Sequence, residues 1–300
     1  MPRLALATAI AAAGSDDDLI PLLDACTTAG LDTVVRAWDD PSVAWARFDA
    51  VLLRSTWDYT ERLPEFLRWC ERVSAQTRLL NPLPVISWNT DKHYLRDLAT
   101  GGVAVVSSAF VEPEDEPLPA LQAFLAAHAD AGEYVVKPTV GAGSRDAQRY
   151  GRAQEFAAAN HIARLLNDGR SVLLQPYLSS VDHDGETALI YFDGRYSHAI
   201  RKGPLLQPND GPTKGLFAAE AIAPRTPGDD ERVLGEQVLV TATKLLGLAM
   251  PLTYARVDLI RSADGQPRLL ELELCEPSLF FAHDDGSAAR FAAIIEKTLR

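Results

Sequence analysis

Along the first eighty residues, short apolar runs alternate with longer amphipathic segments. These patterns indicate strands over 3–9, 31–38 and 48–54, and helices that run from Asp16-Asp17-Asp18 to Ala29 and over 61–76. Strands that alternate with helices are typical of a small parallel α/β sheet. We therefore expect an N-terminal α/β domain whose first helix is capped by the three aspartates.

The rest of the chain shows a mixture of hairpins and helices. We expect strands over 133–138 and 171–178, a hairpin of 187–192 with 195–200 around Asp193-Gly194, and helices over 118–129, 154–167, 229–246 and 287–299. Pro176 interrupts the second of these strands, which marks a sheet edge or a crossing between domains. Apolar positions predict a buried face for helix 229–246, formed by Val233, Leu234, Val238, Ala242 and Leu245.

A second hairpin pattern, 253–260 with 268–274 around Asp264-Gly265, brings acidic residues together. A two-residue loop there would pair Ala263 with Gln266, Asp258 with Glu271 and Arg256 with Glu273. Period-two alternation then separates two faces: Arg256, Asp258, Glu271 and Glu273 on one, and Val257, Leu259, Leu270, Leu272 and Leu274 on the other. Opposed carboxylates repel each other, and a bound Mg²⁺ would reverse that effect. A solvated polar face on an edge hairpin is the alternative.

Composition and charge narrow the class of protein but do not indicate a reaction. With 300 residues, 47% hydrophobic and 23% charged, the chain is expected to be a soluble protein of two or three domains. Its net charge of −12 argues against a nucleic-acid or anionic-membrane surface. Cys26, Cys70 and Cys275 lie far apart without ligand spacing, which predicts reduced thiols and a cytoplasmic location. The first residues have the outline of a secretory signal, but one positive charge and an Ala-rich core favour a first strand and helix.

Three segments carry candidate binding residues. Ser55-Thr56-Trp57-Asp58-Tyr59 follows the third strand, where ligands collect in open α/β sheets, although a packed turn is the alternative. Asn89 to His93 opens a helix with Thr90 or Asp91 as N-cap, so Lys92 falls in its first turn, a position more often taken by a surface lysine. Lys137 ends a strand before the small residues 139–144, whose backbone amides can approach an anion.

Other nucleotide and catalytic motifs are missing from the sequence. No G-x-G-x-x-G follows the first strand and no Gly-Lys-Ser/Thr is present, so neither a Rossmann dinucleotide site nor a Walker P-loop is supported. No Ser-His-Asp or Cys-His set at plausible spacing suggests covalent catalysis, and His93 and His283 are isolated.

The order of these motifs resembles the ATP-grasp enzymes. The resemblance covers residues ~85–280: Lys92 at a helix start, Lys137 before a small-residue loop, Gln175-Pro176-Tyr177-Leu178 and the acidic hairpin. It implies an ATP-grasp fold of the mixed α/β (α+β) class, with a pre-ATP-grasp domain over 1–86, a central lid subdomain over 87–178 and a C-terminal subdomain with the metal site over 179–300. Residues 55–59, 88–92 and 271–278 are similar, more narrowly, to the cyclo-ligases of D-cycloserine biosynthesis.

The resemblance implies ATP and two Mg²⁺ ions as cofactors and assigns residues to them. Lys92 and Lys137 would hold the α- and β-phosphates, and Gly141, Ala142, Gly143 and Ser144 would form a mobile lid. Gln175, Tyr177 and Leu178 would bind adenine, and Glu186 the ribose. Asp258, Glu271 and Glu273 would ligate the metal ions, with Glu273 where most ATP-grasp enzymes have Asn. Residues Ser55, Thr56, Trp57, Asp58, Tyr59 and Ser278 would hold the amino-acid end of a substrate.

The implied reaction activates a carboxylate as an acyl phosphate. Arg256, and also Arg201 and Lys202, are candidates for contacting the transferring phosphate; a salt bridge from Arg256 to Glu273 and surface exposure of the other two are the alternatives. The expected partner is a small amino-acid-like molecule, with O-ureido-D-serine cyclised to D-cycloserine. An intermolecular amino-acid or peptide ligase and a non-catalytic nucleotide-binding protein are the other hypotheses. The oligomeric state stays open, with a homodimer as one alternative.

Overall fold

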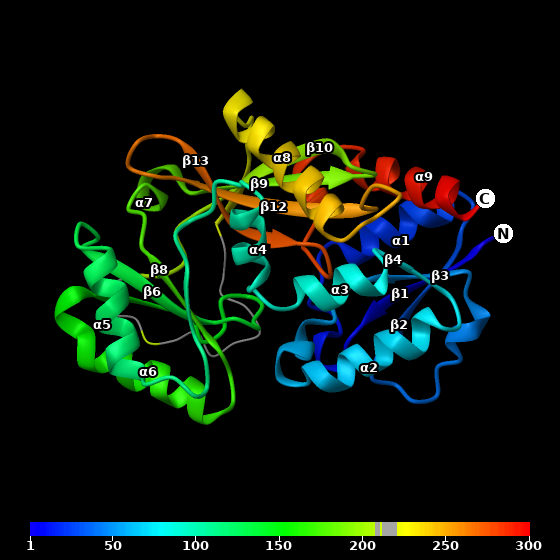
Figure 1. Cartoon of the computed structure of the whole chain (residues 1–300). Helices are drawn as coiled ribbons and strands as arrows, with labels where there is room; N and C mark the ends of the chain where they lie inside the picture. Colours follow the sequence, from blue (N-terminus) through cyan, green and yellow to red (C-terminus); the bar gives the residue numbers. More distant parts are fainter. Residues whose placement is uncertain (208–210, 212–220) are drawn as a thin grey trace.

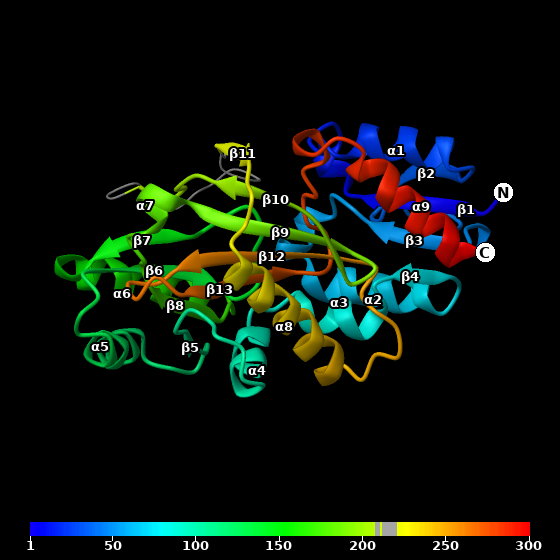
Figure 2. The ribbon, with the colours of Figure 1, turned by 90° about the horizontal axis from the view of Figure 1, so that it is seen from above.

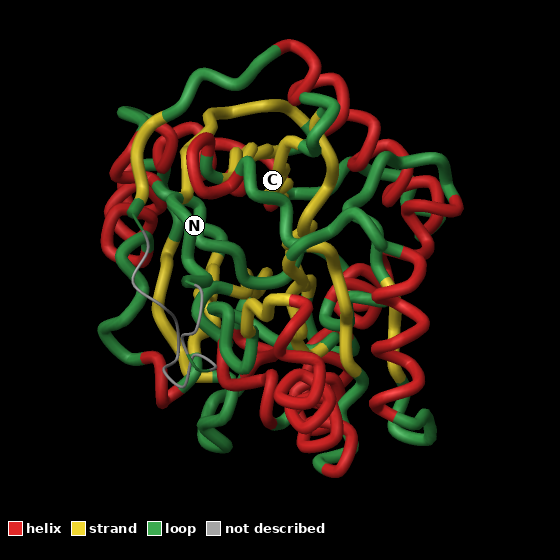
Figure 3. The backbone as a smooth tube through the Cα atoms, turned by 90° about the vertical axis from the view of Figure 1, so that its left-hand side faces the viewer, coloured by secondary structure: helices red, strands yellow, loops and turns green. Residues whose placement is uncertain are grey.

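The computed structural model describes residues 1–207, 211 and 221–300, whose strands form three sheets (Figure 1). In Figure 3, helices lie on the right, at the bottom and at the upper left of the molecule, with strands between them. Within the described residues, no helix combines the length and the apolar character needed to cross a membrane. The three sheets agree with the expected mixed α/β class.

The N-terminal sheet is parallel, with strand order β2-β1-β3-β4. Its elements are β1 (Arg3–Thr8), α1 (Leu19–Thr28), β2 (Asp32–Ala37), β3 (Ala50–Leu53), α2 (Leu63–Ser74) and β4 (Arg78–Leu80). Alternate residues of β1 are buried on opposite faces: Leu4 and Leu6 pack with α1, whereas Ala5 and Ala7 pack with α2. The N-terminal apolar run is therefore an inner strand of this sheet, as the sequence predicted.

The aspartates before α1 do not cap it, so that prediction is wrong. Asp18 takes the N-cap position without a side-chain capping bond. Its carboxylate instead accepts the backbone N–H groups of Leu279, Phe280 and Phe281 at 2.5, 3.0 and 2.8 Å. Buried Arg54 pairs with it at 3.4 Å and also donates to the carbonyl of Pro277 at 2.9 Å. Asp18 thus ties the N-terminal domain to a C-terminal loop.

We expect Asp18→Asn to lower the free energy of unfolding by about 2–4 kcal/mol, because a buried arginine loses a charged partner and a backbone N–H loses its acceptor. Urea unfolding followed by circular dichroism measures the change. Asp17→Asn, at the exposed neighbouring position, is the matched control and should unfold like the wild type. Equal stabilities of the two variants would contradict this role for Asp18.

The central sheet is antiparallel, in the order β5-β8-β6-β7. It contains β5 (Ala109–Val111), β6 (Glu133–Pro138), β7 (Gln148–Gly151) and β8 (Val172–Pro176), and is covered by α5 (Pro117–Ala127) and α6 (Glu155–Asn167). Pro176 is the last residue of an inner strand, so it does not mark a sheet edge. The chain continues through α7 (Val181–Asp184) into the third sheet, so it passes from one sheet to another after Pro176, and a domain boundary at this point stays a prediction.

The C-terminal sheet has the order β11-β10-β9-β12-β13 (Figure 2). Its strands are β9 (Glu186–Phe192), β10 (Arg195–Lys202), β11 (Ile222–Pro224), β12 (Tyr254–Arg261) and β13 (Pro267–Glu273). Asp193 and Gly194 both have positive φ, 51° and 70°, as a two-residue hairpin turn requires. One face packs under α4 (Tyr94–Thr100) and α8 (Asp229–Leu245), and α9 (Ser287–Leu299) packs beside α1 (Figure 1).

The predicted buried face of α8 is partly wrong. Leu234, Val238 and Ala242 are buried, but Val233 and Leu245 are 65% and 48% exposed. Gly235 and Leu239 complete the buried stripe on the opposite flank. The helix is therefore rotated toward that flank relative to the prediction, which turns Val233 and Leu245 to solvent.

The acidic hairpin has the predicted pairing at its charged end and a different turn. Asp258 faces Glu271 and Arg256 faces Glu273, but the register then shifts so that Leu259 faces Leu269 and Arg261 faces Pro267. The loop spans residues 262–266 rather than two residues, so Ala263 does not pair with Gln266. A bulge next to Leu270 compensates for the longer loop. Leu270 consequently leaves the predicted apolar face, and Leu269 takes its place in the core.

Side chains cover the outer edge of β13. The short helix α3 (Leu83–Asn89) follows β4, and Asn89 bonds both the carbonyl of Leu272 and the N–H of Leu274, at 2.8 and 2.6 Å. Asn81, with φ of 61°, donates to the carbonyl of Leu274 at 2.8 Å. The hydroxyl of Tyr94 accepts the N–H of Leu272 at 3.0 Å. These bonds hold the strand that carries Glu271 and Glu273 in place.

Candidate active site

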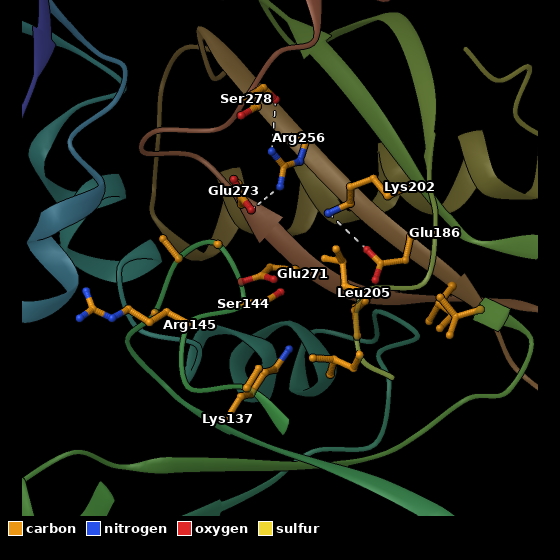
Figure 4. Close-up of a pocket in the computed structure, with 18 of the residues that line it drawn as sticks. Lys137, Ser144, Arg145, Glu186, Lys202, Leu205, Arg256, Glu271, Glu273 and Ser278 are labelled. Atoms are coloured by element: carbon orange, nitrogen blue, oxygen red, sulfur yellow. Dashed lines mark hydrogen bonds and ion pairs between the residues drawn. The ribbon is translucent and has the colours of Figure 1, made fainter. Parts of the chain in front are cut away.

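A cavity of about 420 Å³ lies where the central and C-terminal sheets face each other, with one end closed by loops of the N-terminal domain. Figure 4 shows Lys137 reaching into it from the central sheet, opposite Glu271, Glu273 and Arg256 on the C-terminal sheet. Acids and cations from separate parts of the chain thus share one enclosed space. The alternative of a solvated polar hairpin face is thereby excluded.

Arg256 lies at the centre of the acidic face. Its Nε donates to Asp258 Oδ1 at 2.9 Å, its Nη2 pairs with Glu273 Oε1, and its Nη1 donates to the carbonyl of Ser278 at 3.2 Å. The alternative of a salt bridge to Glu273 is therefore present in the structure. Because the guanidinium also borders the cavity, it is placed to meet a ligand as well.

Lys202 supplies a second buried cation to the same network. Its Nζ lies 2.8 Å from Asp258 Oδ2 and 3.2 Å from Glu186 Oε2. Although burial opposes ionisation, Arg256 and Lys202 lower the pKa of Asp258 to about 2. Lys202 is thus not a surface residue. Arg201, by contrast, points away and bonds the carbonyls of His183 and Asp184.

Lys92 lies before a helix rather than in its first turn, because α3 ends at Asn89 and α4 begins at Tyr94. Neither Thr90 nor Asp91 caps α4. The Lys92 ammonium lies 2.8 Å from Glu271 Oε1 and 2.8 Å from the carbonyl of Gly141. It is buried, so the surface-lysine alternative is wrong. Lys92 joins the acidic hairpin to the small-residue loop.

Lys137 lines the cavity without any hydrogen bond or ion pair recorded among the described residues. Burial lowers its pKa, and Lys92 and Lys202 add to the decrease, while Glu271 opposes it. An ammonium group that lies near two other cations, and to which no described anion is bonded, is well placed to bind a phosphate.

We expect Lys137→Ala to raise the KM for ATP by roughly 10–100-fold, the loss of one charge-assisted hydrogen bond. Initial-rate kinetics with varied ATP measure it. Lys244→Ala, at an exposed position on α8, is the control and should leave KM unchanged. An unchanged KM for Lys137→Ala would remove this lysine from the phosphate site.

The small-residue loop forms one wall of the cavity through Gly141, Ala142, Gly143 and Ser144. Gly143 and Ser144 have positive φ, 60° and 58°. Arg145 also lines the cavity, but its guanidinium points away from the other labelled side chains (Figure 4) and pairs with Glu61 of the N-terminal domain. The loop is thus anchored by Lys92 at one end and by Arg145 at the other. Whether it acts as a lid stays a prediction.

The predicted adenine residues lie together at one end of the cavity. Gln175, Tyr177 and Leu178 line it, and the Gln175 amide donates to Ser108 Oγ at 3.0 Å. Apolar side chains that the sequence did not indicate complete this end: Val106, Ile260 and Leu270. The bulge in β13 is what turns Leu270 toward this space, so no alternation pattern could have placed it there.

Of the five residues after β3, Trp57 lines the cavity. Ser55 and Thr56 are fully buried, with Ser55 bonded to Thr8 at 2.8 Å. The Asp58 carboxylate accepts the indole N–H of Trp38 at 2.8 Å. Tyr59 is buried against Glu276. This segment, which includes the 3-10 helix Trp57–Glu61, therefore packs largely within the protein, and direct substrate contact is supported for Trp57 and not for the other four.

Several residues that line the same end of the cavity were not among the predicted site residues. Ser278 is present as expected. It is joined by the following residues from both ends of the chain: Ser15, Asp16, Asp17, Asp18, Glu276, Phe280 and His283. Glu276 stands inside the quoted 271–278 motif, so the motif was the signal that could have found it. His93, away from this site, bonds Asp91 and Glu112.

The donor set fits Mg²⁺ through two carboxylates rather than three. The side chains of Glu271 and Glu273 are 24% and 29% exposed and border the cavity, whereas both oxygens of Asp258 already bond Arg256 or Lys202. In the part of the chain that the structure describes, no three His, Cys, Asp or Glu side chains converge as a complete metal site. One or two protein carboxylates together with phosphate oxygens are the usual Mg²⁺ ligands.

The two glutamates differ in their tendency to ionise. Burial raises the pKa of Glu273 to about 7 despite Arg256, and Asp258 and Glu271 add to the rise. Burial acts in the same direction on Glu271, but Lys92 and Lys137 lower its pKa to about 2. A divalent cation beside Glu273 would favour its charged form.

Comparison with known proteins finds relatives that match the chain over nearly its whole length. A family model described as "D-cycloserine synthetase DcsG, N-terminal domain" matches residues 4–81. The chain is 47% identical over 300 residues, all of both sequences, to the cycloserine biosynthesis protein DcsG of Streptomyces lavendulae. It matches the crystal structure of D-cycloserine synthetase DcsG with a TM-score of 0.94 and 46% identity, covering 99% of this chain and 100% of that one.

More distant structures share the fold. The ATP-grasp ligase PsnB, in a complex with a precursor variant, Mg and ADP, matches with a TM-score of 0.64 and 18% identity, covering 99% of each chain. D-alanine–D-alanine ligase from Bacillus anthracis matches with a TM-score of 0.65 and 15% identity, covering 100% of this chain and 97% of that one. The predicted ATP-grasp fold is confirmed.

Proposed function

Because this chain belongs to the D-cycloserine synthetase family of ATP-grasp ligases, we propose that it cyclises O-ureido-D-serine to D-cycloserine with ATP and Mg²⁺. The observation that carries this proposal is the cavity in which the ammonium of Lys137, to which no described residue bonds, faces Arg256 and the carboxylates of Glu271 and Glu273. Such a cavity offers phosphate, metal and carboxylate contacts in one place. The enzyme class, a ligase, follows from the family.

The residues divide the cavity into three parts. We propose that adenine binds among Gln175, Tyr177 and Leu178, the ribose toward Glu186, and the phosphates between Lys92, Lys137 and the loop of Gly141 to Ser144, all of which line the cavity. Glu271 and Glu273 would hold Mg²⁺, and the ion would supply positive charge to neutralise the phosphoryl oxygens. A second ion with Asp258 as a further ligand would require this carboxylate to give up a bond to Arg256 or Lys202. The substrate lies toward Trp57 and Ser278.

The proposed reaction has three steps: phosphoryl transfer to the substrate carboxylate, ring closure with loss of phosphate, and hydrolysis of the carbamoyl group. A carboxylate oxygen of the substrate attacks the γ-phosphorus, the bond to ADP breaks, and an acyl phosphate forms. The substrate nitrogen that is bonded to oxygen attacks the acyl carbon, loses its proton, and displaces phosphate. The five-membered ring still carries the carbamoyl group, which D-cycloserine lacks, so water removes it as carbon dioxide and ammonia.

This chain contributes position and charge to these steps. Arg256 orients the substrate carboxylate toward the phosphoryl group and stabilises the charge that develops there. Lys202 keeps Asp258 ionised, which holds the guanidinium in place. Enclosure between the central and C-terminal sheets, with loops of the N-terminal domain at one end, keeps water from the acyl phosphate. Because the attack is intramolecular, folding the substrate correctly supplies much of the rate.

A coupled ADP-release assay tests the proposal. With O-ureido-D-serine as the sole amino acid, we expect steady ADP formation together with D-cycloserine detected by mass spectrometry. ADP formation that requires a second amine would instead indicate an intermolecular amino-acid or peptide ligase. Binding of ATP without ADP release for any amino-acid substrate would indicate a nucleotide-binding protein without activity. The three buried free cysteines support our further expectation of a cytoplasmic location.

A further inference from the structure

Glu276 is a buried carboxyl group at the end of the cavity opposite the adenine residues. It is 8% exposed and borders the cavity together with Trp57, Ser278 and Phe280. Its position is fixed: the indole N–H of Trp57 donates to its backbone carbonyl at 3.2 Å, and the hydroxyl of buried Tyr59 bonds its carboxyl group. A carboxyl group held in this way is prepared for a ligand rather than free to turn to solvent.

The cations near Glu276 already have anionic partners. Lys92 pairs with Glu271, and Arg256 pairs with Asp258 and Glu273. Among the described residues no ion pair is recorded for Glu276. The other titratable groups that act on it or are affected by it come from the 3-10 helix Trp57–Glu61, from α2 and β12 and from its own segment. None of them is cationic: Tyr59, Cys70, Tyr254, Glu273 and Cys275.

The absence of an ion pair makes the charged form of Glu276 unfavourable. Burial raises its pKa to about 8, and Glu273 adds to the rise, while the Tyr59 hydrogen bond opposes it. A buried carboxylate without a counter-ion is costly, and a cation brought by a ligand removes that cost. The carboxyl group of Glu276 therefore favours ligands that carry a positive charge at this end of the cavity.

We propose that Glu276 binds the α-ammonium group of the amino-acid substrate and thereby selects amino acids over plain carboxylic acids. This inference rests on the proposed function, which places an amino-acid substrate in this cavity. An α-amino acid carries its ammonium and carboxylate groups on the same carbon. The two recognising side chains must therefore lie close together, and Arg256 meets this condition because it bonds the carbonyl of Ser278, two residues after Glu276.

The test compares two substrates in two proteins. The first substrate is O-ureido-D-serine, and the second is 3-(ureidooxy)propanoate, which lacks only the amino group. We expect the wild type to prefer the amino substrate in kcat/KM by roughly 10–100-fold, the value of one charge-assisted hydrogen bond. Glu276→Gln should remove most of this preference by raising the KM of the amino substrate, with the KM for ATP and the rate with the desamino acid unchanged.

Two further variants make the result specific. Glu276→Asp keeps the charge and should retain part of the preference, whereas Glu114→Gln, at an exposed loop position, should retain all of it. A Glu276→Gln enzyme that loses activity equally with both substrates, or that keeps the wild-type preference, would overturn the proposal. If Glu276→Gln fails to fold, the test relies on Glu276→Asp. Should Glu276→Asp prefer the amino substrate as strongly as the wild type does, the proposal would be overturned.

The same experiment distinguishes failure of the proposed function from failure of ammonium binding by Glu276. If wild-type enzyme does not turn over O-ureido-D-serine, the same comparison is made with any amino acid that does support ADP release and with its desamino analogue. A preference that depends on Glu276 would then support ammonium binding even though the substrate is another amino acid. A preference that survives Glu276→Gln in that series would overturn it.

Discussion

Arg256→Lys is expected to lower kcat by about 10²–10³-fold while the protein stays folded. Lysine keeps the positive charge beside Asp258, so the buried carboxylate is not left without a partner. It cannot reproduce the planar fork that bonds Asp258, Glu273 and the Ser278 carbonyl at once. The orientation of the substrate carboxylate should therefore be lost. Steady-state ADP release with saturating ATP measures the change.

Two observations separate this catalytic role from a structural one. The thermal midpoint of Arg256→Lys should stay near that of the wild type, and its KM for ATP should change little because the adenine end and Lys137 are untouched. A variant that retains wild-type kcat would show that Arg256 serves only as the salt-bridge partner of Glu273.

Glu271→Gln is expected to lower turnover by at least ~100-fold. The amide keeps the shape of the side chain and an oxygen for Lys92, so the hairpin register should persist. What disappears is a carboxylate that stays ionised at neutral pH and lies beside the phosphate-binding lysines. We expect the Mg²⁺ concentration needed for half-maximal activity to rise strongly, because a neutral amide is a weaker ligand for a hard cation.

Titration of activity with Mg²⁺ at fixed ATP measures this effect, and circular dichroism confirms the fold. Glu114→Gln, which removes an exposed carboxylate that does not line the cavity, is the matched control. Wild-type turnover and an unaltered Mg²⁺ dependence in Glu271→Gln would exclude a metal role for this residue.

The acidic hairpin shows which features local sequence patterns can predict and which they cannot. Alternation around Asp264-Gly265 predicted the correct opposition of Asp258 with Glu271 and of Arg256 with Glu273. The predicted loop was too short, yet the charged pairs kept their register because a bulge near Leu270 absorbs the difference. A bulge is selected by packing on the sheet face, and neither the turn residues nor the alternation specify it. The opposition of the charged residues was therefore predictable from the sequence, but the position of Leu270 was not.

Contacts between distant segments account for what the sequence did not predict. Asp18 was assigned to a helix cap, a local role that its position favours, but in the folded chain it binds the backbone of residues 279–281. The indole of Trp57 and the carbonyl of Glu276 are 219 positions apart in the chain and bond at 3.2 Å. No periodicity or spacing in the sequence indicates such a pairing. The resemblance to ATP-grasp enzymes gave the order of the binding residues, whereas the geometry that identifies Glu276 required the fold.

The central claim is that the substrate carboxylate attacks ATP to form an acyl phosphate in this cavity. The most direct measurement uses O-ureido-D-serine labelled with ¹⁸O in its carboxylate and follows the label into inorganic phosphate by mass spectrometry. Attack by the carboxylate transfers one labelled oxygen to each phosphate released, and this is the result we predict. Phosphate that carries no label, released at the rate of ADP formation, would show that water attacks ATP instead and would contradict the account.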